Sequence, residues 1–162
     1  MALTVVTNAS PLIHLGYMDM LEVLPKIYSR IYCSRAVATQ VEYPKAAADF
    51  VKGLEIFEVK DRGLVELIRA KHPRLDIGEI ETFVLHKELN TDEALFLNNR
   101  AENIFTSEYR GIIRDLVDLP NADTAPLMFL SQEHIDRFYI KLAEVVKGYK
   151  KLEKILRERG LR

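Results

Sequence analysis

Short apolar runs that stop at a polar residue and lead at once into a helix signal recur along this chain. The first run, Leu3–Thr7, is followed by Ser10 and Pro11, a hydroxyl suited to capping a helix and a proline suited to its first position. The second run covers residues 31–33, with Ser34 as the expected cap. Strands that alternate with helices in this way predict parallel pairing, because a crossover helix separates each strand from the next.

Further segments extend the same pattern. Residues 54–59 and 93–97 predict strands, residues 63–72 and 77–89 predict helices, and Asp76 is the expected cap of the second of these helices. Residues 100–116 predict mostly helix. We therefore expect an α/β fold with three layers, α/β/α, in which helices cover both faces of a central parallel sheet. Ligands bind beyond the carboxyl ends of such strands, and Asn8 lies at one of these ends.

The C-terminal segment, residues 133–162, has a different pattern. Its apolar residues alternate at spacings of three and four, and they are Ile135, Phe138, Leu142, Val145, Tyr149, Leu152 and Leu156. This spacing predicts one long amphipathic helix that packs either on its own domain or on a partner, although Gly148 weakens it. We expect a main domain over residues 1–132 followed by this helix, and a homodimer where the helix joins two copies.

Composition limits the environment and the partners. The formal net charge is −1, but residues 136–162 hold nine Lys/Arg and four Asp/Glu, so a basic tail follows a mildly acidic body. No signal peptide and no apolar run long enough to span a membrane is evident, which predicts a cytoplasmic protein without a membrane partner. The lone Cys33 is typical of a buried thiol rather than a nucleophile.

Three stretches together carry a family resemblance: "VVTNASPLIHLG", "CSRAVATQVE" and "LDIGEIETFVLHKELNTDEALFLNNRAEN". In this order they resemble the PIN-domain family, and within it the VapC-like toxin ribonucleases of toxin–antitoxin pairs. The resemblance implies a PIN-like fold, RNA as the substrate and an antitoxin protein as a partner. It also implies magnesium or manganese as the cofactor, held by acidic side chains that neutralise the ions.

Carried over to this sequence, the acidic motif is largely replaced by amides. Asn8 stands at the end of the first strand, and Gln40 stands on the helix after the second, with Glu42 two residues on. Asn98 and Asn99 stand at the end of the fourth strand. Glu79 keeps its acid and is the expected metal ligand, and the Ser10 hydroxyl is expected to orient a ligand.

Two alternatives stay open at this point. In one, residues 102–110 form the fourth strand, and Ser107 and Glu108 close it instead of Asn98 and Asn99. In the other, Asn8 is simply a helix-capping residue, which is a common role for asparagine after a strand.

An amide supplies an oxygen ligand but no charge to offset a divalent cation. We therefore expect metal-dependent nuclease activity that is weak or lost, with magnesium or manganese bound if the protein is active and no cofactor otherwise. The alternative function is a non-catalytic module that binds RNA or protein. In either case Arg35 and Arg100 are candidates for contacts with RNA phosphates.

Overall fold

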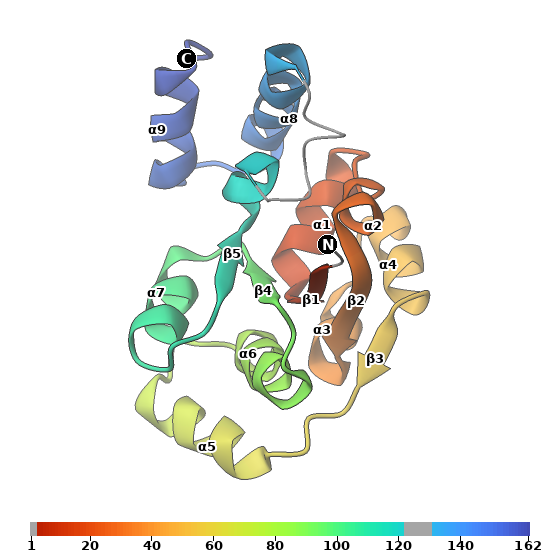
Figure 1. Cartoon of the computed structure of the whole chain (residues 1–162), viewed down its shortest axis with the longest axis vertical. Helices are drawn as coiled ribbons and strands as arrows, with labels where there is room; N and C mark the ends of the chain where they lie inside the picture. Colours follow the sequence, from red (N-terminus) through yellow and green to blue (C-terminus); the bar gives the residue numbers. More distant parts are fainter. Residues whose placement is uncertain (1–2, 122–130) are drawn as a thin grey trace.

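The computed structural model describes residues 3–121 and 131–162. Its centre is a five-stranded sheet in the order β3-β2-β1-β4-β5, in which every strand pair is parallel. The strands are β1 (Leu3–Thr7), β2 (Tyr28–Ser34), β3 (Glu55–Phe57), β4 (Glu93–Phe96) and β5 (Ile113–Asp115). The predicted α/β fold with a central parallel sheet is confirmed (Figure 1).

Helices cover both faces of this sheet, which gives the three layers. One layer holds α1 (Ala9–Tyr17), α2 (Val23–Ile27), α3 (Arg35–Gln40), α4 (Lys45–Lys52), α8 (Gln132–Val145) and α9 (Lys150–Glu158). The other holds α5 (Arg62–Lys71), α6 (Ile77–Leu89) and α7 (Asn99–Ser107).

Adjacent residues of β1 show why both faces must be covered. Val5 joins the hydrophobic cluster of the first layer and Val6 joins that of the second, and both side chains are fully buried. Successive side chains of a strand point to opposite faces. A strand with buried apolar side chains on both faces therefore needs a helical layer on each side.

Helix caps follow the sequence signals in two of the three predicted places. The Ser34 hydroxyl accepts a hydrogen bond from the Val37 N–H, and Asp76 caps α6. The expected cap at Ser10 is wrong, because α1 begins at Ala9 and its cap position is Asn8. Ser10 instead lies in the first turn of α1.

The expected single long helix over residues 133–162 is also wrong. α8 ends at Val145, α9 begins at Lys150, and Gly148 between them has a φ of +69°. This left-handed conformation suits glycine and cannot continue a helix. Four of the seven apolar positions, Phe138, Leu142, Leu152 and Leu156, are buried in the same cluster as α1.

The 1–132 range expected for the main domain includes residues 1–2 and 122–130, which lie outside the described residues. Within the described part of the chain, no helix combines the length and the apolar character needed to cross a bilayer.

The order of the strands places a crevice at β1. From β1 the chain builds outward through β2 and β3, and it then returns to the other side of β1 with β4. Side chains after the carboxyl ends of β1 and β4 therefore meet where the direction of strand addition reverses. The Asn8 N–H donates to the Leu95 carbonyl over 2.9 Å, so the residue after β1 is tied to β4.

Candidate functional site

A cavity of about 300 Å³ lies at this crevice. It brings together five of the residues that the sequence predicts for the site, together with Asp76. The polar residues that line it are Asn8, Ser10, Gln40, Asp76, Glu79 and Asn98. They come from the ends of β1 and β4, the last residue of α3, and the first turns of α1 and α6.

Glu79 is the buried acid of this cavity, and both of its carboxylate oxygens accept hydrogen bonds. Oε1 accepts from the Asp76 N–H over 2.9 Å, while the Asp76 side chain accepts from the Glu79 N–H over 2.8 Å. These reciprocal bonds form a capping box at the start of α6. Oε2 accepts from the side-chain amide of Asn98 over 2.6 Å. Burial raises the pKa of Glu79, an effect that the hydrogen bonds from the Asp76 N–H and the Asn98 amide and the charge of Arg100 partly offset.

Asn98 uses both ends of its side-chain amide. Its Oδ1 accepts from the N–H groups of Arg100 and Ala101 over 3.0 and 3.2 Å, which caps α7, while its Nδ2 binds Glu79. The alternative that placed a strand over residues 102–110 is wrong, because α7 covers this segment as far as Ser107 and residues 108–110 form no strand. Glu108 lies just after α7, where its carboxylate is 2.9 Å from the His72 Nε2 atom, and Ser107 is exposed there.

Asn8 occupies the cap position of α1, but its side chain makes no cap hydrogen bond. The residue is 4% exposed, and its Oδ1 has no hydrogen-bond partner within the described part of the chain. A buried amide oxygen without a partner is unfavourable by about 1–3 kcal/mol. The capping role that asparagine commonly has after a strand therefore does not account for this side chain.

Gln40 packs over the first turn of α6. A Cβ atom added at Gly78 would lie 2.2 Å from the Gln40 Oε1 atom. Because glycine has no Cβ, the Gln40 amide has room to lie against the cleft. Glu42, the other candidate at this position, is exposed beyond the end of α3 and does not line the cavity.

The remaining predicted residues lie outside this cavity. Asn99 and Arg100 line a neighbouring cavity instead. Arg35 forms an ion pair with Glu58 at 3.1 Å, with both side chains more than half exposed, and it lines neither cavity. The structure thus brings Arg100 close to the predicted site but not Arg35.

The family resemblance implies one or two divalent ions, and the donor set does not fit a pair. Two adjacent divalent ions need several carboxylates to neutralise them. In residues 3–121 and 131–162, no three Asp, Glu, His or Cys side chains form a group that could hold a metal ion. The two carboxylates of the cavity, Asp76 and Glu79, already accept N–H groups, and the oxygen left without a partner is the neutral Oδ1 of Asn8.

Behind Asn98 lies a buried cluster that the sequence interpretation missed. The Glu102 carboxyl group, on α7, accepts from the Asn98 N–H over 3.0 Å. The Tyr149 hydroxyl donates to Asp115, at the end of β5, and lies 3.4 Å from Glu102. Burial, together with the neighbouring Asp115, raises the pKa of Glu102 well above its usual range. These three residues come from three separate elements, so no spacing pattern in the sequence links them.

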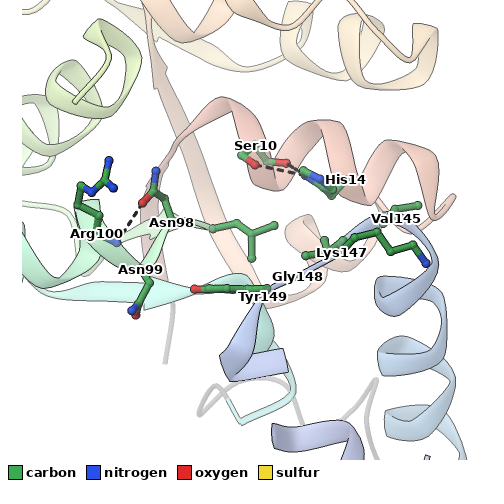
Figure 2. A pocket seen from close by; sticks show the side chains of 11 residues that line it. Ser10, His14, Asn98, Asn99, Arg100, Val145, Lys147, Gly148 and Tyr149 are labelled. Atoms are coloured by element: carbon green, nitrogen blue, oxygen red, sulfur yellow. Dashed lines mark hydrogen bonds between the residues drawn. The ribbon is translucent and has the colours of Figure 1, made fainter. Parts of the chain in front are cut away.

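A second cavity, of about 520 Å³, adjoins the first. Ser10, Leu97 and Asn98 line both. Figure 2 shows Ser10 and His14 of α1 on one side of it and the segment between α8 and α9 on the other. The site is therefore two adjoining cavities, one with acids and amides and one with cations.

The sequence that forms this site matches a known family. A sequence model described as a PIN domain matches residues 4–108, a range that includes Asn8, Gln40, Glu79, Asn98 and Asn99. No curated protein matches the chain. The PIN domain is generally a nuclease fold. Since the matched range covers more than half of the sequence and the sheet is the expected one, the chain belongs to the PIN-domain family.

Proposed function

We propose that this PIN-domain protein is a relative of the metal-dependent ribonuclease toxins of toxin–antitoxin systems in which nuclease activity is weak or lost. The observation that carries the proposal is the hydrogen bond from the Asn98 amide to Glu79 over 2.6 Å. The Asn98 amide, which is a neutral donor, binds the Glu79 oxygen that would otherwise be open to a cation. The cleft is thus held together without a metal ion.

Electrostatics supports the same view. An attraction between unit charges 4 Å apart is about 4 kcal/mol at an effective dielectric of about 20, and a divalent ion doubles it. Each carboxylate replaced by an amide removes such an attraction, although desolvation of the carboxylate offsets part of it. Asn8, Gln40 and Asn98 line the cleft as three such amides.

The experiment that tests the proposal is a manganese-dependent cleavage assay on a mixed single-stranded RNA. We expect wild-type protein to cleave weakly or not at all. The double variant Asn8→Asp/Asn98→Asp should gain cleavage, because aspartate keeps the shape of each amide and restores its charge. Adding Glu79→Ala to the double variant should abolish that gain. Strong wild-type cleavage that is lost in Glu79→Ala alone would overturn the proposal.

Metal affinity gives an independent readout. Titration calorimetry with Mn²⁺ should show weak binding to the wild type and at least about tenfold tighter binding to the double variant, as two added charges predict. Equal affinity in the two proteins would contradict the electrostatic argument, whatever the RNA assay shows. Magnesium serves as the second ion in the same titration.

A second candidate function is a non-catalytic module that binds RNA or another protein in the cytoplasm. The observation in its favour is that Asp76 and Glu79 are both satisfied by N–H donors, which is what a cleft kept for binding alone requires. An antitoxin-like protein or a second copy of this chain are the proposed protein partners. Size-exclusion chromatography with light scattering tests the homodimer directly.

A further inference from the structure

A single carboxyl oxygen connects the C-terminal helices to the cleft that holds Glu79. It is Oε2 of Glu102, a residue of α7 that is 8% exposed. This atom accepts the Asn98 N–H over 3.0 Å and lies 3.4 Å from the Tyr149 hydroxyl. Tyr149 occupies the cap position of α9, whereas Asn98 follows β4. One buried side chain therefore contacts both the last part of the chain and the turn that forms one side of the cleft.

The Tyr149 hydroxyl has a fixed anchor in the sheet. It donates to Asp115, the last residue of β5, which is 2% exposed. The other oxygen of Asp115 accepts the Val117 N–H over 2.8 Å, so this carboxyl group is held at both ends. Figure 2 shows the Tyr149 side chain extending from the segment between α8 and α9 toward Asn99, where α7 begins. The anchored hydroxyl limits the positions that are open to the Glu102 carboxyl group.

Glu102 in turn holds the backbone of Asn98. The Glu102 N–H donates to the Asn98 carbonyl over 3.0 Å, which is an ordinary bond of a first helical turn. The bond from the Asn98 N–H is different, because it exists only while the Glu102 side chain keeps its conformation. Asn98 also reaches Glu79 through its side-chain amide over 2.6 Å. The asparagine side chain is short, so a backbone that moves draws the amide away from Glu79.

Helix capping explains only part of this arrangement. The Asn98 side chain already caps α7, because its Oδ1 accepts the N–H groups of Arg100 and Ala101. That cap does not require Glu102 to be buried. Glutamate is among the side chains least often buried, and burying it is unfavourable unless its polar atoms are bound. The contacts with Asn98 and Tyr149 supply that binding, which makes the buried carboxyl group a connection between them.

We propose that Tyr149 is a positioning residue for Asn98 and that it acts through Glu102. While the tyrosine is seated, the Asn98 amide stays on Glu79. When the segment between α8 and α9 moves away, this contact loosens and Glu79 becomes open to a ligand. The helices that follow the range matched by the PIN-domain family thereby regulate the cleft. The inference rests on the proposed function only in taking this cleft as the functional site.

Hydrogen exchange of backbone amides, followed by NMR without metal ion or RNA, tests the proposal. Tyr149→Phe removes only the hydroxyl and should raise the exchange rate of the Asn98 N–H at least about tenfold, as loss of one hydrogen bond predicts. The side-chain amide signals of Asn98 should also shift toward those of a solvent-exposed amide. Rates are compared with that of the Val6 N–H in the central strand β1, so that a uniform loss of stability is recognised.

Tyr139→Phe is the matched control. It also removes a buried tyrosine hydroxyl, which donates to the Val117 carbonyl over 2.7 Å, and it lies on α8. Its hydroxyl has no printed role at Glu102, so the loss of stability is similar but the connection to Asn98 is kept. Relative to the core amide, exchange at Asn98 should change less than about twofold.

A second pair of variants tests the same connection at Glu102, and it decides the question if Tyr149→Phe does not fold. Glu102→Gln keeps an oxygen that can accept the Asn98 N–H, so exchange should stay within about threefold of the wild type. Glu102→Ala removes the acceptor and should raise exchange at least about tenfold. Added to Glu102→Ala, Tyr149→Phe should have less than about twofold further effect at Asn98, because the connection is already broken.

Three results would overturn the proposal. They are unchanged Asn98 exchange in folded Tyr149→Phe, equal effects of Tyr149→Phe and Tyr139→Phe at Asn98, and independent effects of Tyr149→Phe and Glu102→Ala. The proposed function fails in a different experiment, in which the variant Asn8→Asp/Asn98→Asp gains no cleavage. Because the exchange measurements use neither manganese nor RNA, the two failures are distinguishable.

Discussion

The side-chain amide of Asn98 donates to the Glu79 carboxylate over 2.6 Å, and this contact joins the turn after β4 to the first turn of α6. It links two residues that an acid-based metal site would hold apart around a cation. Replacing Asn98 therefore probes both the stability of the fold and the chemistry of the cleft.

Asn98→Asp should destabilise the protein at neutral pH by about 1–3 kcal/mol, because two carboxylates would then lie at hydrogen-bond distance without a shared proton. Aspartate caps α7 as well as asparagine does. Repulsion raises the pKa of one carboxyl in the folded state, so stability should be full below the unfolded carboxyl pKa and fall as the pH rises through the raised value. Urea unfolding over a pH series checks this. Asn98→Ser keeps a cap and adds no charge, so its loss of stability should not vary with pH in this way.

Glu102→Gln should make the protein less sensitive to alkaline pH. The pKa of Glu102 is raised by burial and by Asp115, so the folded state holds a proton that the unfolded state releases. That contribution to stability is full below about pH 4.5 and is lost as the pH rises towards the raised folded-state pKa. Glutamine resembles the protonated acid and cannot lose the proton. Unfolding free energies from about pH 5 to about pH 9 should fall less in the variant than in the wild type, whereas Glu144→Gln at an exposed position of α8 should follow the wild type.

Gly78→Ala should move Gln40 out of the cleft with little change in stability. The added Cβ would lie 2.2 Å from the Gln40 Oε1 atom, but that atom is the end of a flexible side chain, and alanine favours the helix by up to about 1 kcal/mol. The Gln40 side-chain amide signals should shift in ¹H–¹⁵N spectra while the melting temperature stays nearly constant. Gly53→Ala, where the nearest atom would be 3.5 Å away, should leave those signals in place. Unshifted Gln40 signals in Gly78→Ala would contradict the packing described.

Gly148→Ala should destabilise the link between α8 and α9 by about 1 kcal/mol through its backbone alone. The φ of Gly148 is +69°, and a Cβ there would meet nothing within 4 Å. Gly148→Asn tests the cause, because asparagine tolerates the left-handed region better than alanine does. Unfolding free energies should rank glycine first, asparagine next and alanine last, and equal values for all three would exclude backbone strain.

Much of the fold could be predicted because local signals and the final structure agree. The apolar run at Leu3–Thr7, the Ser34 cap and the Asp76 cap each act within a few residues. The placement of Asn98 after β4 followed from the same kind of signal. One cavity is lined by four residues that the family motif predicts for the site, Asn8, Gln40, Glu79 and Asn98.

The missed strand shows where local signals fail. β5 has three residues, and its apolar position Ile113 continues the helical spacing of Ile104 and Phe105, so the sequence predicted helix through it. The helix ends instead at Ser107. Beyond it Arg110 has a φ of +55°, and the Gly111 N–H bonds back to the Phe105 carbonyl over 2.8 Å. The glycine was the one visible signal that this helix stops.

The break between α8 and α9 and the buried acids depend on long-range contacts. The apolar spacing from Ile135 to Leu156 favours one continuous helix, but Tyr149 binds Asp115 and draws the chain back to the sheet. From the sequence alone, Glu102 and Asp115 would be expected to be solvent-exposed charges. Both are buried in the structure, and the Tyr149 hydroxyl contacts both of them.

The link between α8 and α9 lies outside the part of the chain that the PIN-domain family shares. The sheet and its crevice belong to the part that the family shares, whereas residues 145–149 add a wall in which Lys147 and Gly148 are exposed. Substitutions in those few residues would alter the shape and charge of the larger cavity and leave the sheet intact. Relatives with the same scaffold can thus diverge in what they recognise through changes far along the chain from the motif by which they are grouped.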